Sequence, residues 1–521
     1  MNRGGFAAPV LPQGGLGPAI GRAVAIVIPL ALVYVAVLNN FYSSGDMLDP
    51  VWLASIAWHS DFGQHAPPAM PVSFFTSHVS PIFWLPNLVS YVLPLSKIDY
   101  FGLWYGGIYA LYSAGIYKAW LLNRPKAASG LAVLGEVPLA VVVGLAATFS
   151  AFPMQALRLP HYELALPAFA LWFLITLVEG RYRWAILWFA LCLMVREDAG
   201  LHLFAVLFLW GAAWRFTSTF YARPWPRARY VWAFAAAALA YAIFAVLLKN
   251  FVIQADNLFT RLYVGTPPWH HITGELLLER LRFYALERTW ITVPLLVTMG
   301  WAAISRNPLL PLGYIAFLPW LLLNFQATHV TPGTLGYYYG FPFWLALAWP
   351  LIALHLWPQL GQRPPRRWPY LLVLAASLAG WQYDRVVVYP LQKGFFDKYP
   401  FAITSELLHR HNYEEFVGYF AAHEKEFARS GVDLAVFGLV MDHVTRRNWL
   451  EEQKLTDPPE ILIYFTGGFE WPIHVVPLLA TGFYGHFYQV PGTRIELAAH
   501  APLDTLVPGP SPFVPEASPL F

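Results

Sequence analysis

The sequence predicts an all-α polytopic membrane domain of about 11 transmembrane helices, followed by a small C-terminal α/β domain. Of its 521 residues, 57% are hydrophobic and only 12% are charged, which excludes a water-soluble fold of this length. A helix needs about 20 apolar residues to cross a bilayer, where unpaired backbone groups find no water. Apolar stretches of this kind recur along the chain, most clearly at residues 23–39, 101–122, 131–151, 164–178, 232–252 and 309–325.

Basic residues fall in every second connection between the apolar stretches, which sets the orientation. The positive-inside rule places these connections in the cytoplasm, together with the amino terminus. The first stretch is then a retained membrane anchor. The basic residues concerned are Arg3, Arg22, Arg124, Lys126, Arg181, Arg183, Arg215, Arg223, Arg227, Arg229, Arg306, Arg363, Arg366 and Arg367. The outer connections are residues 41–79, 152–163, 196–199, 253–288 and 326–341.

Two of the expected spans are unusually short. As a helix, residues 184–195 extend only about 18 Å, against about 30 Å of hydrocarbon, and residues 199–214 are little longer. The turn between them, residues 196–198, is therefore expected to be recessed below the membrane surface. Charges at that depth are costly and are usually functional or paired. Residues 81–95 are expected to form a re-entrant or surface segment, because an extra span there would reverse the side of every later connection.

The chain changes character after its last apolar stretch, which divides it into domains at 1–382 and 383–521. The second domain mixes polar and apolar residues in the proportions of a soluble fold, and the alternation of sides places it outside the cytoplasm. Residues 502–521 are rich in proline and are expected to be irregular. A helical pattern and four strand-like runs are expected at residues 413–430, 433–438, 460–465, 487–490 and 493–497.

Net charge, cysteine content and the absence of soluble-enzyme motifs exclude several classes of partner and of site. The net charge is +3, but the basic residues are sorted to one face of the membrane, so no nucleic-acid partner is predicted. Cys192 is the single cysteine, which excludes a disulfide framework and a thiolate metal site. The phosphate-binding glycine loop, the HExxH motif and the nucleophile elbow of soluble enzymes do not occur.

The first outer loop, residues 41–79, carries two candidate catalytic carboxylates, Asp46 and Asp49. Their spacing places them on one face of a helix. A carboxylate held just above lipid is suited to act as a general base or as a metal ligand. Mg²⁺ or Mn²⁺ is conceivable here, although two carboxylates make a weak site without a substrate phosphate. The alternative is a helix cap, since Ser-Gly-Asp and Asp-Pro both commonly begin helices.

Further candidate substrate-binding residues lie in the other outer connections. Arginine and histidine can bind phosphate through charge-assisted hydrogen bonds, and aromatic rings suit sugar stacking or lipid headgroups. The alternatives are a structural histidine, interfacial anchoring, a buried salt bridge and the aromatic belt common to membrane proteins. The amphipathic residues 275–288 are interpreted as a solvated surface helix. The candidates are His78, Arg158, His161, Glu163, Arg196, Glu197, Asp198, His202, Tyr337, Tyr338 and Tyr339.

The order of these motifs resembles the GT-C superfamily of glycosyltransferases that use lipid-linked sugars. More narrowly, it is similar to a family of predicted bacterial membrane proteins, domain of unknown function 2079. The resemblance covers most of the chain, including the terminal domain, through short motifs. These motifs are residues 46–52, 78–81, 195–198 and 337–343.

The resemblance implies about a dozen spans with an outward-facing cavity beneath the first outer loop. It implies inverting transfer of a sugar from a polyprenyl-phosphate donor to a glycan, lipid or protein acceptor, at the periplasmic face of a bacterial inner membrane. Asp46 matches the position of the general base best, and Asp49 is second. Arg158 and Arg196 would neutralise the departing phosphate, because no lysine of the first outer loop matches a phosphate-binding role. Glu197 would bind sugar hydroxyls or orient Arg196, as would its neighbour Asp198.

Two other classes of function remain open. A transporter or flippase would also need buried charges, but it typically shows inverted repeats and broken helices, and no such repeat is evident in this sequence. A non-catalytic membrane protein of envelope assembly would bind through the terminal domain. Such a protein would tolerate the loss of Asp46, whereas an enzyme would not.

Overall fold

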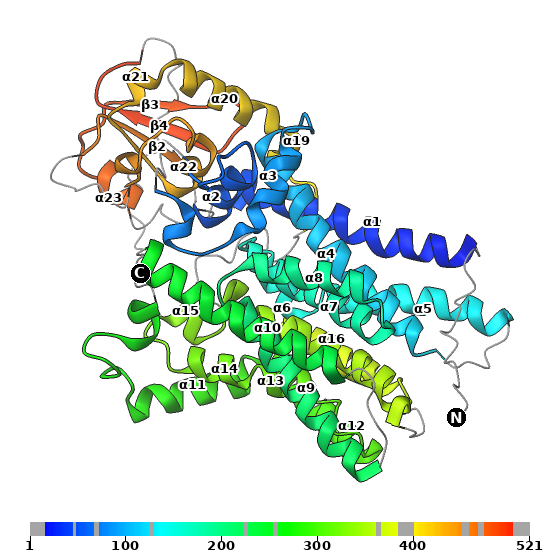
Figure 1. The fold of residues 1–521 in the computed structure, drawn as a ribbon. Helices are drawn as coiled ribbons and strands as arrows, with labels where there is room; N and C mark the ends of the chain where they lie inside the picture. The colour runs from blue at the N-terminus through cyan, green and yellow to red at the C-terminus, as the bar shows by residue number, and fades with distance from the viewer. Residues whose placement is uncertain are drawn as a thin grey trace.

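The computed structural model is mostly helical, with a small mixed sheet at one end of the helical bundle (Figure 1). Asp46 and residues 504–521 belong to the parts of the chain that the structure does not describe. The residues described are 16–44, 48–66, 72–124, 130–221, 228–253, 259–360, 366–383, 401–450, 458–466 and 474–503.

Within these described residues, five helical segments are long and apolar enough to cross a membrane. They are Leu16–Tyr42, Tyr162–Glu179, Ala199–Phe216, Ala228–Ile253 and Val330–Leu356. Shorter apolar helices accompany them at Gly135–Thr148, Tyr182–Val195, Thr289–Ser305 and Pro369–Ala379. The expected membrane character is thus supported by several apolar helices, while the expected number of spans stays a prediction.

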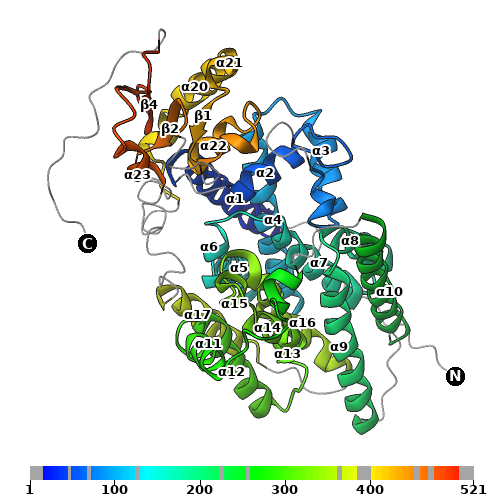
Figure 2. The ribbon, with the colours of Figure 1, turned by 90° about the vertical axis from the view of Figure 1, so that its left-hand side faces the viewer.

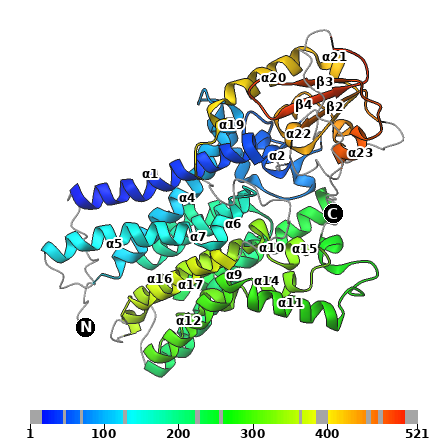
Figure 3. The ribbon, with the colours of Figure 1, turned by 180° about the vertical axis from the view of Figure 1, so that it is seen from behind.

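The helices run largely alongside one another, and the small sheet lies next to α2 (Leu48–Ala57) and α19 (Ser405–Leu408) at one end of the bundle (Figures 1 and 3). The first half of the chain forms α1 (Leu16–Asn39), η1 (Asn40–Ser44), α2 (Leu48–Ala57), α3 (Trp84–Ser90), α4 (Lys97–Leu122), α5 (Gly130–Thr148), α6 (Ala151–Ala156), η4 (Tyr162–Leu164), α7 (Ala165–Glu179), α8 (Tyr182–Val195), α9 (Ala199–Tyr221) and α10 (Ala228–Leu247). The rest of the bundle forms η5 (Leu248–Ile253), η6 (Thr260–Val264), α11 (Gly274–Leu286), α12 (Thr289–Ser305), α13 (Leu312–Ala316), α14 (Leu318–Phe325), α15 (Val330–Gly333), η7 (Tyr337–Gly340), α16 (Phe341–Leu356) and α17 (Pro369–Tyr383).

Small residues allow the helices to pack closely. A Cβ atom added to Gly106 of α4 would lie 2.7 Å from the carbonyl oxygen of Leu30 in α1. A Cβ atom added to Gly200 of α9 would lie 2.3 Å from the carbonyl oxygen of Ala238 in α10. Backbones that approach this closely gain van der Waals contact, which is a main source of helix association in membranes.

Two apolar stretches differ from continuous spans. Residues 309–325 divide into α13 and α14 at Phe317, because Pro319 in the first turn of α14 has no N–H group to continue the preceding helix. Residues 81–95 form a 3₁₀ turn followed by α3, which has seven residues. A helix of that length rises only about 10 Å, so this stretch does not cross a bilayer, as the sequence predicts.

The C-terminal domain contains a four-stranded mixed sheet in the order β1-β2-β4-β3. Strand β1 pairs in parallel with β2, whereas β4 runs antiparallel to both β2 and β3. The strands and helices are α19 (Ser405–Leu408), α20 (Arg410–Ala422), α21 (Glu424–Phe427), β1 (Ser430–Val432), α22 (Leu434–Val440), β2 (Ile461–Phe465), α23 (Val476–Leu479), β3 (His486–Gln489) and β4 (Ile495–Ala499). Three of the expected strands are therefore confirmed, as β2, β3 and β4.

The strand expected at residues 433–438 is wrong. The strand at this point is β1, which ends at Val432, and α22 follows it. Asp433 caps α22, since its side chain accepts a hydrogen bond from the backbone N–H of Val436 at 2.9 Å. A short buried apolar run does not distinguish a strand from a helix by its periodicity, so the capping aspartate was the more informative signal.

Candidate functional site

The segments that the sequence assigns to the outer side gather at one end of the bundle. Helices α2, α11 and α15 lie at the end that carries the C-terminal domain in both Figures 1 and 3, and Figure 1 shows α3 at the same end. This arrangement brings together residues that are far apart in the sequence. It positions most of the candidate polar side chains around the turn between α8 and α9.

Asp49 lies in the first turn of α2, where a carboxylate interacts favourably with the positive end of the helix dipole. It is half-buried and acts electrostatically on Tyr338 and Tyr339. The first outer loop therefore reaches the aromatic segment of η7 at this carboxylate. Asp46, the preferred candidate base, lies outside the described residues, and its role stays a prediction.

Glu197 is the centre of one buried cluster, which we call the anchor cluster. Its Oε1 atom lies 3.2 Å from Nδ1 of His78 and accepts a hydrogen bond from Lys249 Nζ at 2.8 Å. Its Oε2 atom accepts a hydrogen bond from the backbone N–H of Val79 at 3.0 Å. Lys249 also donates to the carbonyl oxygen of Ser77 at 2.7 Å. These contacts tie residues 77–79 of the first outer loop to the α8–α9 turn and to η5.

The anchor cluster holds a charged carboxylate and a neutral imidazole. Burial lowers the pKa of His78 below its usual range, and this outweighs the opposing effect of Glu197. Burial by itself would raise the pKa of Glu197, but His78, Arg196 and Lys249 together hold it well below its usual range. Because a carboxylate only accepts hydrogen bonds, His78 carries its proton on Nδ1 when it contacts Glu197.

Arg196 is the centre of a second cluster, which we call the arginine cluster. Its guanidinium is paired with Glu163 and lies 2.8 Å from Oδ2 of Asp198. The same group lies 5.8 Å from the ring centroid of Trp320, within range of a cation–π contact. With two carboxylates beside it, the charge of Arg196 is already neutralised by the protein.

Several buried polar atoms of the arginine cluster have no hydrogen-bond partner within the described part of the chain. They include Oε2 of Glu163, Oδ1 of Asp198 and Nε2 of His202. Nε2 of His202 lies 3.7 Å from Oδ2 of Asp198, which is too long for a hydrogen bond. Buried polar groups in folded proteins are normally paired with protein, water or ligand. The cluster thus has carboxylate oxygens available to accept hydrogen bonds from hydroxyl groups.

His161 joins the arginine cluster to the tyrosines of η7. Its Nδ1 atom lies 3.9 Å from Oε2 of Glu163, and its ring stacks on Tyr338 with centroids 3.7 Å apart. Burial, together with the nearby His78 and Arg196, lowers the pKa of His161 well below its usual range. Tyr338 in turn stacks on Tyr339, whose carbonyl oxygen accepts a hydrogen bond from Trp320 at 2.8 Å.

Most of the candidate residues therefore meet, although they come from separate connections. The two clusters and the tyrosines beside them contain His78, His161, Glu163, Arg196, Glu197, Asp198, His202, Tyr338 and Tyr339. Arg158 is half-buried after α6, and Tyr337 is half-buried at the start of η7.

Sequence reasoning missed Lys249 and Trp320. Both lie in apolar stretches that hydropathy alone assigns to spans, residues 232–252 and 309–325. A signal was present for Lys249, because a lone lysine near the outer end of an apolar stretch needs a carboxylate partner or a water-filled surrounding. Trp320 offered no comparable signal, since tryptophan is common in membrane helices.

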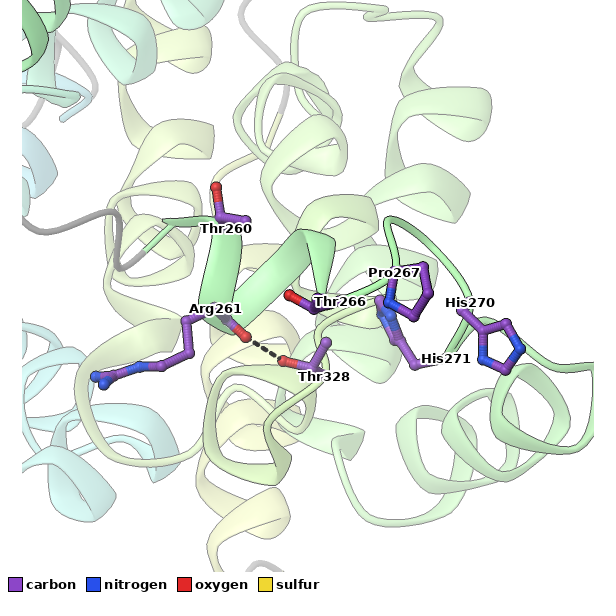
Figure 4. Close-up of a pocket in the computed structure, with 8 residues that line it drawn as sticks. Thr260, Arg261, Thr266, Pro267, His270, His271 and Thr328 are labelled. Atoms are coloured by element: carbon purple, nitrogen blue, oxygen red, sulfur yellow. Dashed lines mark hydrogen bonds between the residues drawn. The ribbon is translucent and has the colours of Figure 1, made fainter.

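A separate open pocket of about 530 Å³ lies beside η6. Figure 4 shows the two histidines of this pocket at one end, with the guanidinium of Arg261 pointing away from them. Thr328 donates a hydrogen bond to the carbonyl oxygen of Arg261 at 2.7 Å, which links the walls of the pocket. It is lined by Thr260, Arg261, Gly265, Thr266, Pro267, His270, His271 and Thr328. The next helix, α11, was expected to be a solvated surface helix. Its exposed surface includes the apolar side chain of Leu278.

The described residues contain no group of three or more histidine, cysteine, aspartate or glutamate side chains placed to hold a metal ion. Of the two carboxylates considered for Mg²⁺ or Mn²⁺, Asp49 lies in α2 and Asp46 lies outside the described residues. No family model, no curated protein and no solved structure matches this chain.

Proposed function

We propose that this protein is a membrane glycosyltransferase that transfers a sugar from a polyprenyl-phosphate donor to a hydroxyl group of a glycan, lipid or protein acceptor. We place it in the bacterial inner membrane, with about 11 spans, a cytoplasmic amino terminus and a periplasmic C-terminal domain. The observation that carries the proposal is the arginine cluster. It combines carboxylate oxygens that have no hydrogen-bond partner among the described residues with the rings of Trp320, Tyr338 and Tyr339, at the end of the bundle assigned to the outer side.

Carboxylate oxygens and aromatic rings suit a sugar. Oε2 of Glu163 and Oδ1 of Asp198 would accept hydrogen bonds from sugar hydroxyls. Asp46 would act as general base, with Asp49 as second candidate. In the transfer step the base takes the acceptor proton, the acceptor oxygen bonds to the anomeric carbon, and the bond from that carbon to the phosphate oxygen breaks. Direct displacement inverts the configuration at the anomeric carbon.

The departing phosphate needs positive charge where its negative charge develops. Arg196 alone cannot neutralise the phosphate, because Glu163 and Asp198 already offset its charge. We therefore assign part of this role to Arg158 and to Lys249. Lys249 donates to Ser77 and to Glu197, which accounts for two of the three N–H groups of its ammonium.

The direct test supplies radiolabelled polyprenyl-phosphate sugars to membranes that contain the wild-type protein or Asp46→Asn. We expect transfer with the wild type and at least a tenfold loss with the variant, because amide nitrogen cannot accept the acceptor proton. Asp61→Asn is the matched control, since Asp61 is an exposed aspartate of the same loop that pairs with His65. Failure of the wild type to transfer any of several sugars would contradict the proposal, and EDTA would show whether Mg²⁺ or Mn²⁺ is required.

A transporter or flippase for a lipid-linked or small-molecule substrate is the main alternative, because ion pairs buried between spans are also found in transporters. It predicts substrate movement across vesicles without transfer to an acceptor. A non-catalytic role in envelope assembly predicts that Asp46→Asn complements a deletion strain fully.

The proposed orientation has its own test. Alkaline phosphatase fused after Arg385 should be active, because that position would be periplasmic, and phosphatase fused after Arg367 should be inactive. The reverse pair of results would mean that one span has been miscounted.

A further inference from the structure

The C-terminal domain packs on the first outer loop from both sides of the segment 45–47. On the amino-terminal side it contacts the end of α1 and η1. Asn39 donates a hydrogen bond to the carbonyl oxygen of Ala402 at 2.6 Å and accepts one from Thr404 at 3.2 Å. The rings of Tyr42 and Tyr413 lie 5.6 Å apart. Asn39 is buried, and a buried polar side chain needs hydrogen-bond partners. Its two bonds form only when the C-terminal domain sits in this position relative to α1.

On the carboxyl-terminal side, α22 of the domain packs against α2. A Cβ atom added to Gly438 would lie 2.8 Å from Cγ2 and 3.8 Å from Cβ of Val51. Val51 is buried, and a side chain larger than hydrogen at position 438 would displace it. Figure 2 shows α22 beside α2, above the rest of the bundle. The absence of a side chain at Gly438 is therefore what allows this close approach.

Two ion pairs join the same domain to α4. Lys97 lies 2.6 Å from Asp442 and also donates to Ser55 of α2 at 3.2 Å. Arg410 lies 2.8 Å from Asp99. Partly exposed pairs of this kind add little stability, but they fix the orientation of the surfaces they join.

We infer that the C-terminal domain is a positioning element for the first outer loop, holding η1 and α2 in place on either side of the segment that carries Asp46. Its consequence for activity rests on the proposed function, whereas its consequence for domain docking does not. Asn39, Gly438, Lys97 and Asp442 are positioning residues in this inference. They act through the loop and not on a substrate.

The docking is tested by a cysteine pair at Val51 and Gly438. Cβ atoms about 3.8 Å apart match the mean geometry of a disulfide, and this is the distance found between the two positions. Cys192 is buried, which limits side reactions. Val51→Cys with Gly418→Cys is the control, because Gly418 lies on α20 with no neighbouring atom within 4 Å. We expect oxidation to cross-link only the first pair, as a mobility shift that a reductant reverses.

The effect on the loop is tested by Gly438→Ala, compared with Gly418→Ala. We expect Gly438→Ala to lower transfer per folded molecule at least fivefold, because the new methyl group displaces α2, and Gly418→Ala to leave it unchanged. Adding Val51→Ala removes the atom in conflict and should restore transfer. This rescue separates positioning from a general loss of folding, which the yield of monodisperse protein would report.

Each outcome is decisive for one part of the inference. Absence of the Val51–Gly438 cross-link would overturn the docking, whether or not the protein transfers sugars. If the cross-link forms but the wild-type protein transfers no sugar, the proposed function is contradicted and the docking stands. Normal transfer by Gly438→Ala would overturn the positioning role.

Discussion

The anchor cluster and the arginine cluster are built from adjacent residues, yet they use their charges differently. Both oxygens of Glu197 are occupied by protein donors from the first outer loop and η5. In the arginine cluster, Glu163 and Asp198 each keep one oxygen without a partner among the described residues. A carboxylate whose oxygens are all occupied holds segments together, whereas one with a free oxygen is available to a ligand.

The largest effect should come from Glu197→Gln. The change leaves the half-buried ammonium of Lys249 without its carboxylate. Breaking a fully buried pair costs about 3–5 kcal/mol, which is the upper bound here because the Lys249 side chain is 18% exposed. We expect a large fall in thermal stability and in yield, measured on purified protein in detergent. Glu415→Gln is the control, because Glu415 is 66% exposed and pairs with an exposed histidine.

A double variant makes the same comparison sharper. Glu197→Leu with Lys249→Met replaces the whole pair by apolar side chains, which is often nearly neutral for stability. We expect the double variant to be clearly more stable than either single variant. If Glu197→Gln were instead as stable as the wild type and inactive, Glu197 would belong with the ligand-binding carboxylates.

Asp198→Asn should lower the transfer rate and leave the stability of the protein largely unchanged, the opposite of Glu197→Gln. The amide keeps the shape of the side chain, and the pairing of Arg196 with Glu163 remains. We therefore expect a folded protein whose transfer rate falls at least about tenfold, which corresponds to about 1.4 kcal/mol of transition-state stabilisation. A variant that loses stability as Glu197→Gln does, and transfers normally per folded molecule, would remove the contrast between the clusters.

The smallest effect concerns pH. The pKa values of His78 and His161 are lowered by burial, so both imidazoles are neutral in the folded protein near neutral pH. The unfolded chain binds protons on these residues as the pH falls through about 6.5, so stability should decrease there and be fully present above it. Thermal denaturation between about pH 7.5 and 5.5 measures this slope.

Replacing a histidine tests whether the buried imidazoles cause this change of stability with pH. His161→Gln should flatten it, while His411→Gln should leave it unchanged, because His411 is 75% exposed. An equal slope in both variants would assign the pH dependence to other groups.

The sequence predicted several apolar helices and the strands β2, β3 and β4, because hydropathy and alternation are local properties. It could not assign the partners of Glu197, since those come from residues 77–79 and from Lys249, far away in the chain. It also could not show that Arg196 is already neutralised. That depends on the distance to Glu163, which lies 33 residues earlier.

Local ambiguity explains the remaining differences. The apolar run after Asp433 fits a strand and a helix equally well, and only the cap and the packing against α2 decide between them. The expected span at residues 309–325 is divided because a proline lies in the first turn of its second part.

The near-cancellation of charge in the two clusters has a consequence for how substrates arrive. Three carboxylates face two permanent cations, Arg196 and Lys249, so the field beyond their immediate surroundings is weak and slightly negative. Such a site does not attract free anions over long distances, and its encounter rate should vary little with ionic strength. A donor whose phosphate is carried on a lipid avoids this difficulty, because it reaches the site by diffusion within the plane of the membrane.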